Sequence, residues 1–187
     1  MTTLVENSPR AWSERALRPA SWEAALWSEG GQTRRFLAVL RHLELREDDT
    51  LLDFGCGSGR FCEFLPPAVL YHGYDWAPGM LDRMVHEHPR ARPLESLPND
   101  LFDFVVAIGP FNLADGWTKE RTWERVSELW TEHTRQALAL SVYRGHDATC
   151  LRYAPEDLIE LARRLGCSTF TLDASYLEND VLVVLRR

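Results

Sequence analysis

The feature that most constrains the fold is a glycine-rich stretch, LLDFGCGSGRF, at residues 51–61. It places glycines at positions 55, 57 and 59, directly after a run of β-forming residues that contains an acid at position 53. In regular structure each glycine costs about 0.5–1 kcal/mol relative to alanine. Three glycines at this spacing therefore indicate a backbone that turns sharply after a strand and lies close to another body.

Strand and helix patterns alternate along the rest of the chain. The expected strands are 50–54, 70–75, 91–95, 102–109, 137–143, 168–174 and 180–187, and the expected helices are 21–29, 32–45, 60–65, 80–88, 118–136 and 155–165. Only the last two strands lack a helix between them. This order predicts an α/β fold with a doubly wound, mostly parallel, seven-stranded sheet, helices on both faces and an antiparallel C-terminal hairpin.

The length of 187 residues suits a single domain with its own core. Within it we expect an N-terminal helical cap or lid over 1–46 and a Rossmann-like core over 47–187. Gly30 and Gly31 are expected to break the cap into two helices. The second of these should bury the apolar residues at positions 36, 37, 40 and 43.

The net charge of −7 disfavours a broad nucleic-acid surface, because phosphate contacts need clustered Lys and Arg. The only lysine is Lys119, although an arginine patch within 34–46 leaves a local contact open. No stretch has the apolar length of a membrane span, and the first twelve residues lack the features of a secretory signal. We therefore expect a cytoplasmic protein, either a monomer or a homodimer.

The cysteines and histidines do not indicate a metal site. Four cysteines, at positions 56, 62, 150 and 167, form no C-x-x-C pair and have no zinc-type spacing. We interpret them as reduced thiols. His86 and His88 form an H-x-H, but no second cluster accompanies them.

The glycine loop lies where open α/β sheets bind ligands, at the carboxyl end of a strand that leads into a helix. Its G-x-G-x-G spacing differs from the dinucleotide fingerprint, and no P-loop Gly-Lys-Ser/Thr follows. The next strand ends in Asp75, 20 residues after Gly55, where an acid can accept both hydroxyls of a ribose. The alternatives are an ordinary loop and, for Asp75, an exposed acid or helix N-cap.

Three stretches, LLDFGCGSGRF, YHGYDWAPGML and ESLPNDLFDFVVAIGPFN, follow one another in the sequence. In order and spacing they resemble the motifs of the class I, Rossmann-type methyltransferases that use S-adenosylmethionine (SAM). The resemblance runs from about Gln32 to the C-terminal strands. It implies SAM as cofactor, S-adenosylhomocysteine (SAH) as product, and methyl transfer as the reaction.

The resemblance also implies roles for the first motif. Asp53 matches an acid that orders the glycine loop and lies near the methionine ammonium. Gly55, Cys56 and Gly57 match the backbone beneath the methionine and ribose, and Gly59 completes the exposed backbone of the loop.

Similar roles follow for the second motif and the third strand. Asp75 matches the residue that holds the ribose hydroxyls, and Trp76 and Met80 match residues that pack on the adenine. Leu94 and Glu95 match the segment beside the adenine edge. Many family members carry Asp where this chain has Pro93, so Glu95 or a backbone carbonyl must serve the adenine amine.

Two further segments complete the cofactor site that the resemblance implies. Ile108 and Gly109 match the backbone that meets the methionine part of the cofactor. Arg35 matches the arginine of a Q-x-x-R-F pattern in a smaller subgroup and would reach the cofactor carboxylate. The alternative for Arg35 is a solvated helix residue.

The methyl acceptor is not identified by any motif. Asn112, Tyr143 and His146 follow strand ends near the expected acceptor mouth, and a histidine there could accept a proton from a hydroxyl. The alternatives are a loop histidine without a catalytic role and a packing role for the tyrosine. The aromatic residues Trp12, Trp22, Trp27 and Phe111 are expected either to close a lid or to pack in the core.

The preferred interpretation is a methyltransferase with a small-molecule acceptor. Nucleic-acid amino-methyltransferases resemble one another in an Asn/Asp-Pro-Pro-Tyr/Phe stretch after the fourth strand. Here that place reads Ile108-Gly109-Pro110-Phe111, which lacks the polar first residue. The alternatives are a methyltransferase acting on nucleic acid or protein, and a non-catalytic SAM-binding domain.

Overall fold

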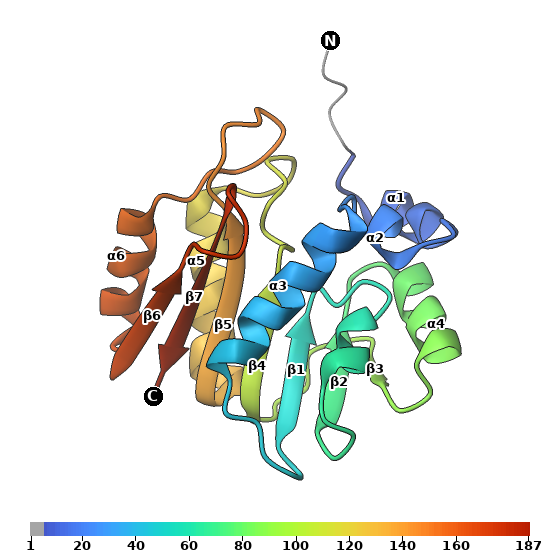
Figure 1. The fold of residues 1–187 in the computed structure, drawn as a ribbon, viewed down its shortest axis with the longest axis horizontal. Helices are drawn as coiled ribbons and strands as arrows, with labels where there is room; N and C mark the ends of the chain where they lie inside the picture. Colours follow the sequence, from blue (N-terminus) through green and yellow to red (C-terminus); the bar gives the residue numbers. More distant parts are fainter. Residues whose placement is uncertain (1–5) are drawn as a thin grey trace.

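A seven-stranded sheet forms the centre of the structure, a computed structural model that describes residues 6–187 (Figure 1). The first five residues of the predicted cap lie outside this range. The strands are β1 (Thr50–Phe54), β2 (Leu70–Tyr74), β3 (Arg92–Leu94), β4 (Phe102–Ile108), β5 (Thr134–Tyr143), β6 (Thr169–Asp173) and β7 (Asp180–Arg186). Their order is β3-β2-β1-β4-β5-β7-β6, and only β7 runs antiparallel to its neighbours. The predicted sheet and its closing hairpin are confirmed.

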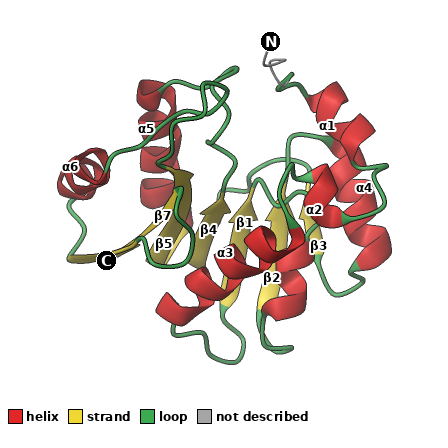
Figure 2. Cartoon of the chain, turned by 45° about the horizontal axis from the view of Figure 1, so that its top comes forward, coloured by secondary structure: helices red, strands yellow, loops and turns green. Residues whose placement is uncertain are grey.

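Helices cover both faces of the sheet (Figure 2). The helical elements are α1 (Pro9–Arg15), α2 (Ser21–Ala24), α3 (Glu29–His42), the 3-10 helix η1 (Arg60–Phe64), α4 (Pro78–Glu87), α5 (Lys119–Glu128), the π-helical turn η2 (Leu129–His133) and α6 (Pro155–Leu165). One apolar core joins α3, η1 and α4 to the sheet, and the other joins α5, η2 and α6 to the opposite face. The predicted two-faced arrangement is therefore confirmed.

The central strands are apolar along their length because they are buried on both faces. Leu51 and Leu52 in β1 are both fully buried, although their side chains point to opposite sides of the sheet. The short strand β3 lies at the sheet edge, where Pro93 is tolerated because its missing N–H removes no central ladder bond. This edge position reconciles the proline with the predicted third strand.

The N-terminal helices differ from the prediction. Helix α1 was not predicted, although the Ser8 hydroxyl caps it and Pro9 occupies its first turn. Gly30 and Gly31 do not break a helix but form the first turn of α3, where the Ser28 hydroxyl accepts the Gly31 N–H at 3.1 Å. The predicted helix over 21–29 shrinks to α2 as a result. Leu37, expected on the buried face of α3, is 47% exposed.

The predicted helix over 118–136 was too long. Helix α5 ends at Glu128, η2 continues to His133, and β5 begins at Thr134. The Thr134 hydroxyl donates to the Leu129 carbonyl at 2.8 Å, which satisfies a carbonyl at the end of the helix. Val126 of α5 and Leu129 and Trp130 of η2 are all buried in the core on the same face of the sheet.

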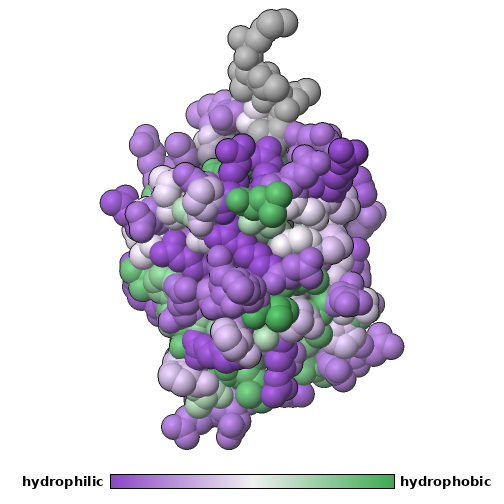
Figure 3. Space-filling view, turned by 90° about the vertical axis from the view of Figure 1, so that its right-hand side faces the viewer, coloured by the Kyte–Doolittle hydropathy of each residue, from purple (hydrophilic) through white to green (hydrophobic). Residues whose placement is uncertain are grey.

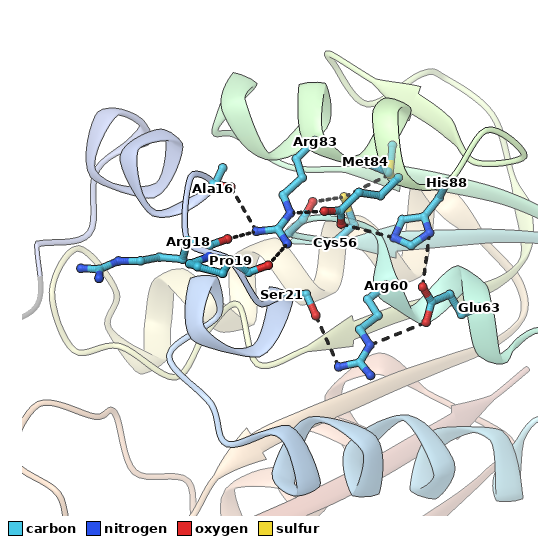
Figure 4. Close-up of polar contacts among 12 residues, drawn as sticks. Ala16, Arg18, Pro19, Ser21, Cys56, Arg60, Glu63, Arg83, Met84 and His88 are labelled. Carbon is cyan, nitrogen blue, oxygen red and sulfur yellow. Dashed lines mark hydrogen bonds and ion pairs between the residues drawn. The ribbon is translucent and has the colours of Figure 1, made fainter.

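The helical cap lies at the carboxyl ends of the parallel strands, beside α4 (Figure 1). Arg83 of α4 holds it there, because its guanidinium donates to the carbonyls of Ala16, Arg18 and Pro19 (Figure 4). The Ser13 hydroxyl also accepts the Gly79 N–H at 3.1 Å. Helix α1 and the loop after it are thus fastened to α4 by polar contacts to main-chain atoms. Helix α3, the last helix of the predicted 1–46 cap, packs instead in the core against the sheet.

The outer face around α1 and α4 is mainly hydrophilic, with apolar side chains only in small separate patches (Figure 3). Within residues 6–187, no helix has the length and apolar character needed to cross a membrane.

Candidate functional site

A cavity of about 580 Å³ lies beneath the cap, at the carboxyl ends of the central strands. This volume falls within the range of roughly 300–1,000 Å³ that is typical of small-molecule sites. Most of the predicted site residues line it: Arg35, Asp53, Gly55, Cys56, Gly57, Asp75, Trp76, Met80, Ile108, Gly109, Asn112 and Tyr143. These residues come from five separate stretches of chain, so the fold brings the predicted motifs together.

Four predicted site residues do not line this cavity. Gly59 is buried against α4, Leu94 packs on the core beneath α5 and α6, and Glu95 is exposed. His146 lies instead in a separate depression of about 290 Å³, together with Arg144 and Arg152.

The three glycines of the loop share a left-handed backbone but serve different purposes. Their φ angles are +75° at Gly55, +55° at Gly57 and +75° at Gly59, a region that favours glycine. A Cβ at Gly55 would lie 2.5 Å from the Pro110 Cβ, and a Cβ at Gly59 would lie 2.7 Å from the Met84 Sδ. A Cβ at Gly57 would meet no atom within 4 Å. Only Gly57 therefore leaves its backbone open to a ligand.

Asp75 links the end of β2 to this loop. Its Oδ2 accepts the Gly57 N–H at 2.9 Å, and its Oδ1 accepts the Ala77 N–H at the same distance. Burial raises the pKa of Asp75, while these two backbone hydrogen bonds act in the opposite direction. Each carboxylate oxygen can accept more than one hydrogen bond, so both keep capacity for a ligand.

Asp53 lies under the same loop and is 3% exposed. Its Oδ2 accepts the Tyr71 hydroxyl at 2.7 Å. Burial is the main reason that the pKa of Asp53 rises to about 7; the Tyr71 hydrogen bond opposes the rise and the charge of Asp75 adds to it. A cationic group in the cavity would favour the charged form of Asp53 and lower this pKa.

The buried carboxyl of Asp53 leads to a prediction about stability. Its folded pKa of about 7 exceeds the ordinary value of 3.8, so the folded state holds this proton more tightly than the unfolded state. The resulting stabilisation is complete below pH 3.8 and is lost as the pH rises to about 7. We expect Asp53→Asn to remove this loss, which amounts to about 4 kcal/mol.

Urea unfolding of the wild type and of Asp53→Asn between pH 5 and 9 measures the part of this loss that falls above pH 5, which is about 3 kcal/mol. The difference in unfolding free energy should move in favour of the variant as the pH rises to about 7, and should level off above it. Parallel stability curves for the two proteins would contradict the raised pKa.

Asn112 and Tyr143 lie side by side in the lining of the cavity. The Asn112 Oδ1 accepts the Tyr143 N–H at 3.0 Å, which leaves the amide NH₂ of Asn112 as its available donor. The Tyr143 hydroxyl accepts the Asp147 N–H at 3.1 Å and is thus turned toward the following loop. Asn112 therefore presents a hydrogen-bond donor to the cavity.

Arg35 is held by an ion pair on one side and by an aromatic ring on the other. Its guanidinium lies 2.6 Å from the Asp180 Oδ2, and its Cζ lies 4.6 Å from the centre of the Trp27 ring. Asp180 is 1% exposed, and this burial raises the pKa of its carboxyl. The charge of Arg35 acts in the opposite direction and favours the ionised form of Asp180. Arg35 lines the cavity, but its charge is already neutralised within the protein.

Sequence reasoning missed part of the cavity wall. Trp117, just before α5, and Arg121 and Arg125 within α5 line it, and Asn7 lines it from the cap. The Asn7 side-chain amide donates to the Asp115 carbonyl at 2.6 Å and connects the cap to the loop after β4. These residues belong to no motif. The contact that places Asn7 joins segments 108 residues apart, so no local signal could have identified it. Trp117 and Arg121 are instead placed by contacts within residues 111–121.

A second group of potential ligands lies at η2. Side-chain atoms of Glu128, Glu132 and His133 come within 4.8 Å of one another. Glu128 already accepts the Arg125 guanidinium at 2.6 Å, and Glu132 is exposed. The cavity therefore remains the candidate functional site.

The lining of the cavity fits a nucleoside. Gly57 offers open main chain, Asp75 offers a carboxylate for two hydroxyls, and Trp76 offers a ring that is 44% exposed. Met80 is buried among cap residues and supports this wall from behind. The set matches the chemistry of a ribose with a stacked base.

Comparison with known proteins identifies the fold. No protein family and no curated protein sequence matches this chain. Among solved structures, the N-methyltransferase NodS of Bradyrhizobium japonicum, in complex with SAH, shares 15% identity over 97% of this chain and 99% of its own, with a TM-score of 0.71. Magnesium protoporphyrin IX methyltransferase (ChlM) of Synechocystis, with bound SAH, shares 12% over 94% and 92%, with a TM-score of 0.63.

A third similar structure is phosphoethanolamine N-methyltransferase 1 of Haemonchus contortus, in complex with phosphoethanolamine and SAH. It shares 12% identity over 100% of this chain and 51% of its own length, with a TM-score of 0.69. The chain therefore has the fold of the class I SAM-dependent methyltransferases, which confirms the fold that its motifs imply.

Proposed function

We propose that this protein is a SAM-dependent methyltransferase that acts on a small molecule. The observation that carries the proposal is the arrangement of Asp75 and Gly57, which are joined by a 2.9 Å hydrogen bond at the edge of a 580 Å³ cavity. This arrangement stands at the carboxyl ends of β1 and β2, where open α/β sheets bind nucleosides.

The residues that would hold SAM are the predicted site residues that line the cavity. Asp75 would accept the ribose hydroxyls, Gly57 would lie beneath the ribose, and Trp76 would pack on the adenine. Asp53 would face the positive charges of the cofactor. When bound, SAM supplies a methyl group on a positively charged sulfur. The protein must then align an acceptor with that methyl group, and such positioning can lower a barrier by roughly 7–11 kcal/mol.

The acceptor would need no strong base from the protein. Among the described residues that line the cavity, the Asp53 carboxyl accepts the Tyr71 hydroxyl, and the Tyr143 hydroxyl accepts the Asp147 N–H. His146 lies outside the cavity. An acceptor that is already ionised, or is a neutral amine, suits this lining because it reacts without first losing a proton to the enzyme.

The cap residues in the cavity lining support a small acceptor. Asn7 and Trp12 of the cap line the cavity, and Asn7 is bound to the loop at Asp115. Two of the similar structures carry names that state small acceptors, a magnesium porphyrin and phosphoethanolamine. The alternatives are a nucleic-acid or protein substrate and a domain that binds SAM without methyl transfer.

Titration calorimetry with SAH tests the proposal. Saturable one-to-one binding by the full chain is the expected result, and methylation assays with small-molecule extract fractions would then be expected to show an acceptor. Absence of SAH binding at millimolar concentration would falsify the proposal. Methylation of RNA or protein, but of no small molecule, would favour the alternative substrates.

A further inference from the structure

The charges around the cavity are unequal in sign. Its lining includes four arginines, at positions 35, 60, 121 and 125, but only two carboxylates, Asp53 and Asp75. No other acid and no lysine or histidine lines the cavity among the described residues. The two carboxylates belong to the nucleoside side of the site, so every other charged residue of the lining is an arginine.

Three of the four arginines already have a carboxylate partner. Arg35 pairs with Asp180 and Arg125 with Glu128, each at 2.6 Å, and Arg60 lies 3.7 Å from Glu63 (Figure 4). Arg121 has no carboxylate within 4 Å among residues 6–187. Its charge is therefore available to a ligand at the mouth of the cavity.

The position of Arg121 is fixed by its neighbours. One of its guanidinium nitrogens donates to the Gly116 carbonyl at 2.6 Å, and its Cζ lies 5.9 Å from the centre of the Trp117 ring. Trp117 in turn packs edge-on against Phe111, with ring centres 4.8 Å apart. A guanidinium has five N–H donors, so most of those on Arg121 remain free for a ligand.

The cavity lining also provides a second hydrogen-bond donor and several aromatic rings. Asn112 presents its amide NH₂, because its oxygen is occupied by the Tyr143 N–H. Trp12, Trp27 and Trp117 line the same space. An ammonium group would be disfavoured here, because the lining offers it hydrogen-bond donors and a positive charge. An oxygen anion would be favoured, because it can accept hydrogen bonds from the same groups.

We infer that the methyl acceptor is a planar small molecule that carries an oxyanion, either a carboxylate or a phosphate, which Arg121 binds at the mouth of the cavity. This inference rests on the proposed function, since it assigns the ligand of the acceptor half of that site. It selects among small acceptors by charge and excludes cationic amines.

Calorimetry with naphthalene probes on the SAH-loaded full chain tests the inference. The probes are 2-naphthoate, 2-naphthyl phosphate, the neutral 2-naphthamide and the cationic 2-naphthylmethylammonium. We expect at least one anion to bind about tenfold more tightly than the amide, because the hydrogen bonds to Arg121 become charge-assisted. The anion that binds more tightly identifies the form of the oxyanion.

Two variants of α5 make the test specific. Arg121→Gln should abolish the preference for the anion, while Arg125→Gln, one turn along the helix, should keep it because Glu128 already neutralises Arg125. Equal binding of anion and amide, tighter binding of the ammonium, no binding of either anion, or a preference that survives in Arg121→Gln would overturn the inference. Any of these with normal SAH binding leaves the proposed function intact, whereas absent SAH binding overturns the proposed function.

Discussion

Replacing Asp75 with alanine is expected to lower the affinity for SAH by about 100-fold. A carboxylate in this position would accept two ribose hydroxyls, and charge-assisted hydrogen bonds are worth roughly 1.5–3 kcal/mol each. The substitution also releases the Gly57 N–H that Asp75 orders at 2.9 Å. The loss should appear as a change in the dissociation constant measured by calorimetry, with thermal melting run beside it to show that the variant folds.

Asp82→Ala provides the matched control for this experiment. Asp82 is an exposed acid on α4, only seven positions from Asp75, and it does not line the cavity. The Asp82→Ala substitution removes the same charge as Asp75→Ala, so the two variants share any long-range electrostatic effect. An equal loss of SAH affinity in both variants would show that Asp75 does not bind the ribose directly.

Gly59→Ala is expected to destabilise the protein by about 3 kcal/mol or more. A left-handed backbone costs an alanine roughly 1–2 kcal/mol, and the added Cβ would lie 2.7 Å from the Sδ of Met84, which is fully buried. Overpacking of this kind adds about 1–3 kcal/mol. The midpoint of urea unfolding measures the effect.

Gly57→Ala separates backbone strain from packing. It has the same kind of backbone, with φ of +55°, but its Cβ would meet no atom within 4 Å, so we expect a loss of only about 1 kcal/mol of stability. Because Gly57 lines the cavity, the added methyl group should instead lower SAH affinity by about tenfold. If Gly57→Ala destabilised the fold as much as Gly59→Ala, the contact with Met84 would not be the cause.

Patterns within single segments predicted most of the fold. The apolar runs of β1 and β4 predict strands without information from the rest of the chain, because a strand buried on both faces must be apolar throughout. The glycine loop after β1 likewise predicts a turn from its own residues. Helix α1 could also have been predicted, since Asn7-Ser8-Pro9 places a capping hydroxyl and a first-turn proline in order. The double glycine at the start of α3 led to the wrong prediction of a helix break, because the N-cap Ser28 offsets the low helix propensity of the two glycines.

The candidate site was predictable only where a residue's role is set by the backbone near it. Gly57 and Asp75 fall in this group, because both lie within three residues of the carboxyl end of a parallel strand. Gly59 is also a glycine with a left-handed backbone, like Gly57, yet the position of Met84, 25 residues further along, makes it a packing residue. The pairing of Arg35 with Asp180 likewise depends on a strand near the other end of the sequence.

That last ion pair bears on when the protein becomes competent during synthesis. Arg35 lies in α3, and Asp180 opens β7, the final strand. Until the ribosome has released this strand, Arg35 lacks its counter-charge and the sheet lacks β7. A nascent chain can therefore finish this wall of the cavity only after β7 has emerged.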